Sequence, residues 1–215
     1  MVTLISASPS PYARKVRIAL QEKGIPFTLQ TEVPWDSTTQ TPRYNPLEKL
    51  PVLILDDGQT AVYESHFILE YLEAKYPSRT PLVPAIDDVD ARLFARKVEV
   101  VADGICDALV LLFFERQRAE SCQSNEWQAR QHRKVDGGLR ALAEWQKGND
   151  YIVGEQFGLA DIAAGAVLGY LTVRWPDHPW RQQHAELAAY SDVLEDRPSF
   201  KNSRPSPQKI SDRVM

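Results

Sequence analysis

Segments with the residue pattern of β-strands occur only within the first 76 residues of this 215-residue chain. Each is a short apolar or alternating run bounded by proline, glycine or polar residues. Beyond residue 87, apolar residues recur at the three- and four-residue spacing of helices instead. Any sheet in this protein must therefore be built near the N-terminus. The predicted strands are Val2–Ser6, Phe27–Val33, Pro51–Leu55 and Thr60–Tyr63.

Two helices are predicted among these strands. Ser10-Pro11 is a helix start, because serine is a good N-cap and proline suits the first helical position, and Gly24 ends that helix. A second helix begins at Ser65, and residues 34–50 between the two are a proline-rich loop with one short helix. The order β-α-β, loop, β-β-α is that of an α/β, thioredoxin-like domain with a mixed four-stranded sheet.

The rest of the chain is predicted to be helical. Residues 77–86 carry three prolines among polar residues and are expected to be a linker. The sequence therefore divides into a thioredoxin-like domain over 1–76 and an all-α domain over 87–215, whose end after Phe200 is expected to be extended. The predicted helices of the second domain are Asp87–Arg118, Glu126–Lys147, Leu159–Arg174 and Ala185–Glu195.

The composition of the chain excludes several classes of function. The net charge is −4 and the basic residues are dispersed, so bulk electrostatics gives no basis for binding nucleic acid. The sequence contains no run of about 18 apolar residues, the length that a membrane-spanning helix needs. Residues 1–8 lack the basic and apolar regions of a signal peptide. The two cysteines form no disulfide framework and the four histidines show no metal-ligand spacing. We therefore expect a cytoplasmic protein without a metal.

The segment Ser10-Pro11-Tyr12-Ala13 lies in the β–α turn where a thioredoxin-like domain would carry a redox dithiol. Serine and alanine stand at both cysteine positions, which excludes dithiol chemistry because that chemistry needs a protein thiolate. The helix N-terminus still offers partial positive charge and unpaired N–H groups to an anion. Ser10 could donate a hydrogen bond to the thiolate of a bound thiol cofactor, or it could serve only as an N-cap.

Two further positions suit a bound peptide. A cis bond before Pro51 would expose the backbone of Val52 for strand-like pairing with an extended ligand such as glutathione, although Pro51 could also be a plain turn proline. The helix start at Glu64-Ser65 could receive a carboxylate while Glu64 holds an ammonium group, or Ser65 could be a simple N-cap. One carboxylate beside one ammonium is the chemistry of a γ-glutamyl end.

The segments Ser10–Val16, Asn45–Leu53 and Glu64-Ser65, in this order and spacing, resemble those of the cytosolic glutathione transferases, specifically bacterial members with a serine-type active site. The resemblance covers essentially the whole chain. It implies that Ser10 is the catalytic, thiol-activating residue. Lys49 would meet the glycyl carboxylate, although it could also be a solvated loop lysine. The residues implied to hold glutathione are Lys49, Pro51, Val52, Glu64 and Ser65.

The resemblance extends into the helical part of the chain. Gly154–Ile162 resembles the helix-start box of the family, in which Asp161 reaches back to the N–H of the N-cap, here Gly158 in place of the usual serine or threonine. The family also implies a homodimer, and a pocket between the domains for an apolar second substrate. Aromatic side chains at helical spacing belong more often to a hydrophobic core than to the lining of a pocket. The candidates for this pocket are Tyr12, Trp35, Asp103, Phe113 and Tyr170.

The function that this resemblance implies is conjugation of the thiolate of glutathione to an electrophilic, hydrophobic substrate. Other glutathione-dependent chemistry on the same scaffold, as a peroxidase, isomerase or dehalogenase, is left open by the sequence. A non-catalytic protein that binds glutathione, another ligand or a partner is the remaining alternative, and retention of Ser10, Glu64 and Ser65 argues against it.

Overall fold

The computed structural model describes residues 1–212 and divides the chain into two compact units. The first, the sheet unit, comprises Met1–Pro84 together with the C-terminal segment, of which Glu195–Asp212 are described. The second, the helical unit, comprises Ala85–Leu194. The sequence predicts an all-helical domain over 87–215, but the helical unit ends before the C-terminal segment.

The sheet has four strands, β1 Val2–Ser6, β2 Phe27–Thr31, β3 Val52–Ile54 and β4 Ala61–Tyr63, in the order β2-β1-β3-β4. Strand β1 runs parallel to β2 and antiparallel to β3, and β3 runs antiparallel to β4. Every predicted strand is present, although the last three are shorter than expected. This mixed topology confirms the predicted thioredoxin-like domain.

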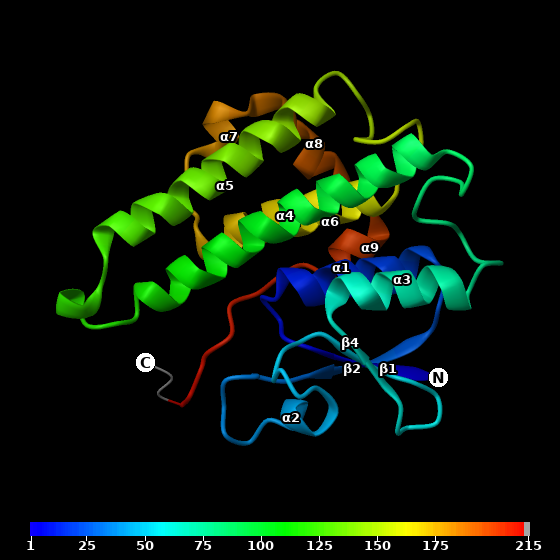
Figure 1. Cartoon of the computed structure of the whole chain (residues 1–215), viewed down its shortest axis with the longest axis horizontal. Coiled ribbons are helices and arrows are strands. Elements are labelled where there is room, and N and C mark those ends of the chain that lie inside the picture. The colour runs from blue at the N-terminus through cyan, green and yellow to red at the C-terminus, as the bar shows by residue number, and fades with distance from the viewer. Residues whose placement is uncertain (213–215) are drawn as a thin grey trace. The chain divides into compact units, whose positions relative to one another are not determined.

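The helices of the sheet unit are α1 Pro11–Glu22, α2 Thr41–Tyr44, α3 Ser65–Lys75 and α9 Pro198–Lys201. Helix α1 ends as predicted, because Gly24 adopts the left-handed φ of 62° that follows many helix ends. Helix α2 is the short helix expected in the loop. Figure 1 shows α1 and α3 lying on one face of the sheet, where the buried side chains of α1 complete the core.

The predicted linker packs onto the sheet unit instead of standing apart from it. The Lys23 ammonium is buried, where it contacts the Glu73 carboxylate at 2.8 Å and donates to the carbonyl of Thr80 at 2.9 Å. Leu82 is only 4% exposed, and its N–H donates to the same carboxylate of Glu73. These contacts explain why the boundary between the units falls after Pro84.

The C-terminal segment joins the sheet unit through buried charges on α1. Arg14 is 1% exposed and donates to the Glu195 carboxylate at 2.8 Å, with its guanidinium stacked over the ring of Phe200. Arg197 pairs with Glu22 at 2.9 Å. A buried charge without a partner is strongly destabilising, so this segment completes the core of the sheet unit.

The helical unit is built around α6, in which every residue from Leu159 to Leu171 is buried. Helix α4 packs against both α5 and α6 (Figure 1). The approach of α4 and α5 is close at Gly138, because a Cβ there would lie 2.4 Å from the side chain of Ile105. Its elements are α4 Val89–Glu115, the 3₁₀ helix η1 Glu120–Cys122, α5 Asn125–Gln146, α6 Leu159–Arg174, α7 Trp180–Gln183 and α8 Ala185–Glu195.

The four long helices predicted for this part of the chain are present, and α6 and α8 have the predicted bounds. The short elements η1, α7 and α9 were not predicted. None of the helices within residues 1–212 combines the length and the apolar character that crossing a membrane requires.

Candidate functional site

Ser10 is the N-cap of α1, and its side-chain oxygen accepts a hydrogen bond from the N–H of Ala13 at 3.2 Å. This bond uses a lone pair of the hydroxyl oxygen and leaves its O–H group as a donor. The hydroxyl also lies at the positive end of a 12-residue helix, which favours an anion nearby. Capping the helix and donating to a thiolate are therefore compatible roles for the same side chain.

The loop that carries Lys49 is organised by Asn45, a buried residue to which the sequence analysis gave no role. Asn45 donates from Nδ2 to the carbonyl of Lys49 at 2.7 Å and accepts from the N–H of Leu47 at 2.9 Å. Between them Glu48 adopts a left-handed φ of 54°. An asparagine followed by proline is a turn signal, so this role could have been suspected. The side chain of Lys49 is exposed.

The Leu50-Pro51 peptide bond is cis, as expected. Val52 follows it as the first residue of β3 and lies between two strands, with Ile5 of β1 and Tyr63 of β4 as its register partners. Val52 is buried. Its use as a pairing backbone for an extended ligand remains a prediction.

Glu64, not Ser65, is the N-cap of α3. Its backbone has a left-handed φ of 74°, and its carboxylate accepts from the N–H groups of His66 at 3.2 Å and Phe67 at 3.1 Å. Ser65 is the buried first residue of the helix, with its hydroxyl 3.5 Å from the Glu64 carboxylate. The simple N-cap interpretation of Ser65 is thus wrong. A carboxylate has room for further donors, so Glu64 can still accept from an ammonium group.

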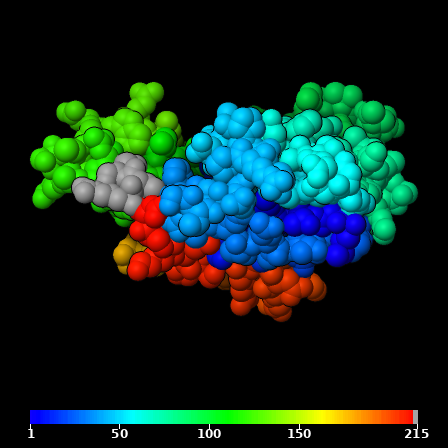
Figure 2. Space-filling model, turned by 90° about the horizontal axis from the view of Figure 1, so that it is seen from below, coloured from blue at the N-terminus to red at the C-terminus, as the bar shows by residue number. Residues whose placement is uncertain are grey.

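The C-terminal segment continues along the loop after β2, as Figure 2 shows in red against blue. Gln208 donates to the carbonyl of Glu32 at 3.1 Å, and the N–H of Ser211 donates to the Asp36 carboxylate at 2.9 Å. The loop contains Trp35, which is 48% exposed. The sequence predicts an extended chain after Phe200, and these hydrogen bonds join that extended chain to the loop after β2.

The five candidates for a second-substrate pocket are divided between the two units. Tyr12 on α1 is half-buried and Trp35 is exposed, and both lie in the sheet unit. Asp103 and Phe113 on α4 are half-buried, in the helical unit. Tyr170 is 5% exposed in the core of the helical unit, and its burial raises the pKa of its phenol above the ordinary range. That burial favours a packing role for Tyr170, and a pocket formed by the others stays a prediction.

Asp161, near the start of α6, is buried and accepts hydrogen bonds from three different residues. Its carboxylate accepts from the N–H of Gly158 at 2.8 Å, from the N–H of Ile152 at 2.9 Å and from the hydroxyl of Tyr190. Burial raises its pKa, while these donors act in the opposite direction. In a capping box, the side chain of the third helical residue accepts from the N–H of the N-cap, and the side chain of the N-cap accepts from the N–H of the third residue. The bond from Gly158 to Asp161 is the first of these, as expected, and glycine has no side chain for the second. The role of this network is structural.

Within residues 1–212, no group of three histidine, cysteine or acidic side chains is arranged to hold a metal ion. The candidate residues of the sheet unit lie instead at two helix starts and in a tight loop. Helix N-termini and hydroxyl donors favour anions such as carboxylates and thiolates.

Comparisons with known proteins give a consistent result. Residues 9–75 match the family model described as glutathione S-transferase, N-terminal domain, and residues 125–192 match glutathione S-transferase, C-terminal domain. The chain is 32% identical to the uncharacterized GST-like protein YibF of Escherichia coli K12 over 94% of this chain and 98% of that protein.

Two solved structures are similar over nearly their whole length. A glutathione S-transferase from Methylobacterium radiotolerans, in complex with glutathione sulfonate, is 58% identical with a TM-score of 0.96, over 100% of this chain and 99% of that one. A glutathione S-transferase from Methylobacillus flagellatus, with glutathione bound, is 38% identical with a TM-score of 0.89, over 95% of this chain and 100% of that one.

Proposed function

We propose that this chain, which belongs to the glutathione S-transferase family, binds reduced glutathione in its sheet unit and conjugates it to electrophilic substrates. The observation that carries the proposal is Ser10 at the positive end of α1, with a hydroxyl hydrogen that its capping bond does not use. The glutathione-bound relatives from two bacteria support the ligand. The identity of the electrophile does not follow from this site.

Each end of glutathione has a chemically suitable partner in this unit. The γ-glutamyl carboxylate would accept from the hydroxyl of Ser65 and from the start of α3, and the ammonium group would donate to Glu64. The Lys49 ammonium would neutralise the glycyl carboxylate, and the backbone of Val52 after Pro51 would pair with the cysteinyl residue. The residues proposed to bind glutathione are Lys49, Pro51, Val52, Glu64 and Ser65.

In the proposed reaction the hydroxyl of Ser10 donates to the sulfur of glutathione and stabilises its thiolate. Each ~1.4 kcal/mol of preference for the thiolate lowers the pKa of the thiol by about one unit, which raises the reactive fraction near neutral pH. The thiolate sulfur attacks the electrophilic carbon of the second substrate, forming a thioether and releasing the leaving group with its electron pair. Holding both reactants together supplies a further part of the rate.

Titration with reduced glutathione tests the binding half of this proposal. We expect wild-type protein to bind glutathione, and Ser65→Ala to bind it about tenfold more weakly, because a hydrogen bond to a carboxylate is lost. The exposed Ser78, in the same unit, provides the matched control Ser78→Ala. Isothermal titration calorimetry measures both affinities. Absence of any binding by the wild-type protein would reject the proposed function, while equal affinities would reject only the role of Ser65.

We propose further that the chain forms a homodimer. Helix α4 exposes Val89 (56%), Leu93 (62%) and Val100 (62%), which lie on one helix face because they are spaced by four and seven residues. An exposed apolar stripe of this kind is typical of an interface between subunits. The family supports a second copy of the chain as its partner.

Placing a charge on this stripe should separate the dimer. We expect Leu93→Asp to shift wild-type dimers to monomers, because a carboxylate would be buried without a partner at the interface. Val193→Asp changes an equally exposed side chain on α8 and should leave the oligomeric state unaltered. Sedimentation equilibrium distinguishes the two states. A wild-type monomer, or a Leu93→Asp dimer of undiminished stability, would contradict this interface.

A cytoplasmic location is the last part of the proposal. Both cysteines lie within the described residues, Cys106 buried and Cys122 exposed, and they form no disulfide with each other. Thiols are kept in this state in a reducing compartment, where reduced glutathione is also available.

A further inference from the structure

The C-terminal segment contacts the sheet unit again beyond α9, through residues 206–212, a stretch that we call the strap. The N–H of Ser206 donates to the carbonyl of Ser8 at 3.4 Å, and Gln208 donates from Nε2 to the carbonyl of Glu32 at 3.1 Å. Ser8 lies in the turn before α1, and Glu32 begins the loop after β2. The strap therefore joins the turn at the start of α1 to this loop.

The end of the strap and the loop hold each other reciprocally. The Asp36 carboxylate accepts from the N–H groups of Ser211 at 2.9 Å and Asp212 at 3.2 Å. In return, the Asp212 carboxylate accepts from the N–H of Ser37. Each donor is a backbone group and each acceptor is a carboxylate, and such charge-assisted bonds are stronger than neutral ones. The strap therefore restrains the backbone of the loop at Asp36 as well as at Glu32.

The loop is also closed at its own base. The Glu32 carboxylate accepts from the hydroxyls of Thr39 at 2.6 Å and Thr41 at 3.1 Å. It also accepts from the N–H of Gln40 at 3.0 Å. The two ends of residues 32–41, which we call the Glu32 loop, therefore meet at one side chain. A loop that is closed at its base and held at two points has little conformational entropy left to lose when a ligand binds.

The Glu32 loop begins beside the turn that carries Ser10. Strands β1 and β2 are parallel, with Ser6 opposite Thr31, so both strands end at the same edge of the sheet. The N–H of Glu32 donates to the carbonyl of Ser6 at 2.8 Å. Ser10 follows Ser6 by four residues, and Trp35 follows Thr31 by four residues. The two segments that leave this edge therefore carry the proposed thiol-activating hydroxyl and a tryptophan.

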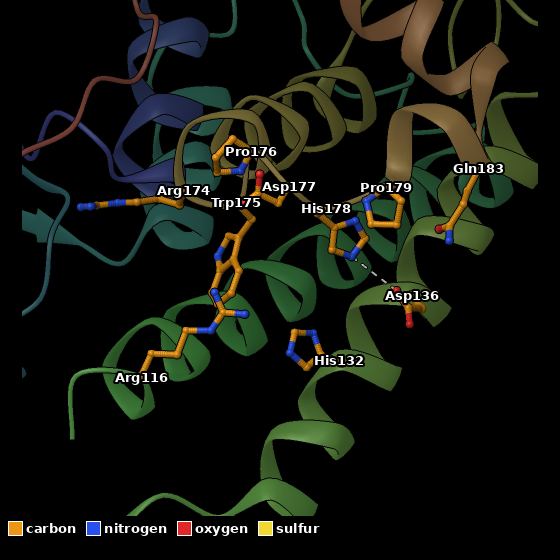
Figure 3. A pocket seen from close by; sticks show the side chains of 10 residues that line it. All are labelled: Arg116, His132, Asp136, Arg174, Trp175, Pro176, Asp177, His178, Pro179 and Gln183. Atoms are coloured by element: carbon orange, nitrogen blue, oxygen red, sulfur yellow. Dashed lines mark ion pairs between the residues drawn. The ribbon is translucent and has the colours of Figure 1, made fainter. Parts of the chain in front are cut away.

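The Glu32 loop presents the ring of that tryptophan at the surface. Trp35 is 48% exposed, more than any of the other four tryptophans, all of which lie within residues 1–212. Trp175 is the contrasting case, because it is 6% exposed and Figure 3 shows Arg116 against its ring. Trp35 lies between Glu32 and Asp36, the two residues that the strap holds. A tryptophan fixed in this way offers a large contact area at a low entropic cost.

We propose, building on the proposed function, that the strap positions Trp35 to contact the ring of an aromatic electrophile while the thiolate stabilised by Ser10 attacks it. Trp35 is then the residue that determines specificity for the second substrate. Gln208 and Asp36 are positioning residues, because they act through the Glu32 loop. Stacking of the substrate ring on the indole holds an aromatic electrophile, and an electrophile without a ring gains nothing from this contact.

Benzyl chloride and allyl chloride test the contact, because both lose chloride to a thiolate in the same displacement and only the first has an aromatic ring. We expect Trp35→Ala to lower the ratio of kcat/KM for benzyl chloride to that for allyl chloride about tenfold, chiefly through the KM of benzyl chloride. Trp35→Phe keeps a ring and should retain most of this ratio. Liquid chromatography of the two thioethers measures the rates. An equal loss for both substrates, or a weaker affinity for glutathione in Trp35→Ala, would overturn the role of Trp35.

Gln208→Ala and Asp36→Ala test the strap, since each removes contacts between the strap and the loop while Trp35 stays in the sequence. We expect the benzyl-to-allyl ratio to fall about threefold in Gln208→Ala and about fivefold in Asp36→Ala, which loses two hydrogen bonds to the strap. Lys209→Ala is the matched control, because Lys209 is the exposed neighbour of Gln208 in the strap. Its ratio should equal that of wild type. A ratio that is unaltered in all three variants would reject the strap as a positioning element.

Hydrogen exchange of the protein without glutathione provides a readout that does not depend on activity. Peptides covering residues 32–41 should exchange severalfold faster in Gln208→Ala and Asp36→Ala than in Lys209→Ala, because the Glu32 loop opens more often when the strap is released. Equal exchange in the three variants would overturn the restraint by the strap. Wild-type protein that does not bind glutathione would reject the proposed function together with the substrate class. Wild-type conjugation with no preference lost in Trp35→Ala would reject only the contact between Trp35 and the substrate.

Discussion

Ser10→Ala is expected to lower kcat for glutathione conjugation by about 100- to 1,000-fold while leaving the affinity for glutathione nearly unchanged. The range is that found when one preorganised donor to a developing or stable anion is removed from an enzyme. The affinity survives because the two ends of glutathione are proposed to bind elsewhere, at Lys49 and at Glu64-Ser65. Conjugation of chlorodinitrobenzene, followed by its absorbance change, measures the activity.

The acidic limb of the pH–rate profile provides the mechanistic signature. The thiolate is the nucleophile, so activity falls below the pKa of the bound thiol. Without the Ser10 hydroxyl that pKa should move up towards the value of a free thiol, and the limb should shift to higher pH. Ultraviolet absorbance of the thiolate in the binary complex reports the same shift directly.

Two variants separate this role of Ser10 from its role as N-cap. Loss of the cap costs roughly 1 kcal/mol of stability, so thermal unfolding of Ser10→Ala should be compared with its kinetics. Ser8→Ala, in the same turn but two residues before the cap, should keep full activity. Full activity of Ser10→Ala would reject the serine mechanism, and a large loss in Tyr12→Phe would transfer the role to the neighbouring hydroxyl.

The second large effect is expected at Asp161. Asp161→Ala should reduce the free energy of unfolding by about 3–5 kcal/mol, because two backbone N–H groups and the hydroxyl of Tyr190 lose their shared buried acceptor. Tyr190→Phe removes only one donor and should cost about 1–2 kcal/mol. Urea denaturation of both variants measures the difference.

Glu155 lies in the loop before α6 and is exposed. Glu155→Ala is therefore the control for loss of a carboxylate without loss of a buried network. Its unfolding midpoint should match that of wild type. If Asp161→Ala were no less stable than Glu155→Ala, the three hydrogen bonds would not contribute to holding the loop before α6.

The parts of the fold that could be predicted from the sequence have local causes. Pro11 and Gly24 delimit α1 because each has a backbone preference that needs no distant partner. The predicted bounds of α6 are those observed, because the run from Leu159 to Leu171 is apolar apart from Asp161 and is too long for a strand. Strand lengths were less accurate, since strands end where their neighbours in the sheet end.

What could not be predicted depends on contacts between distant residues. Arg14 is paired with Glu195, 181 residues away, and nothing near Arg14 in the sequence indicates that it is buried. Glu64 as the cap of α3 depends on an uncommon backbone conformation, which a glutamate gives no reason to expect. The candidate positions in the sheet unit were recognised mainly because their segments resemble a family.

The pairing of Arg14 with Glu195 has a consequence for how the protein is made. The first 84 residues leave the ribosome long before the residues that cover the buried guanidinium. We therefore expect the nascent N-terminal part to stay incomplete until translation has nearly finished. A gene fragment that stops at the end of this part would encode a polypeptide with an uncovered buried charge, and joining residues 195–212 to it by a short linker should restore its folding.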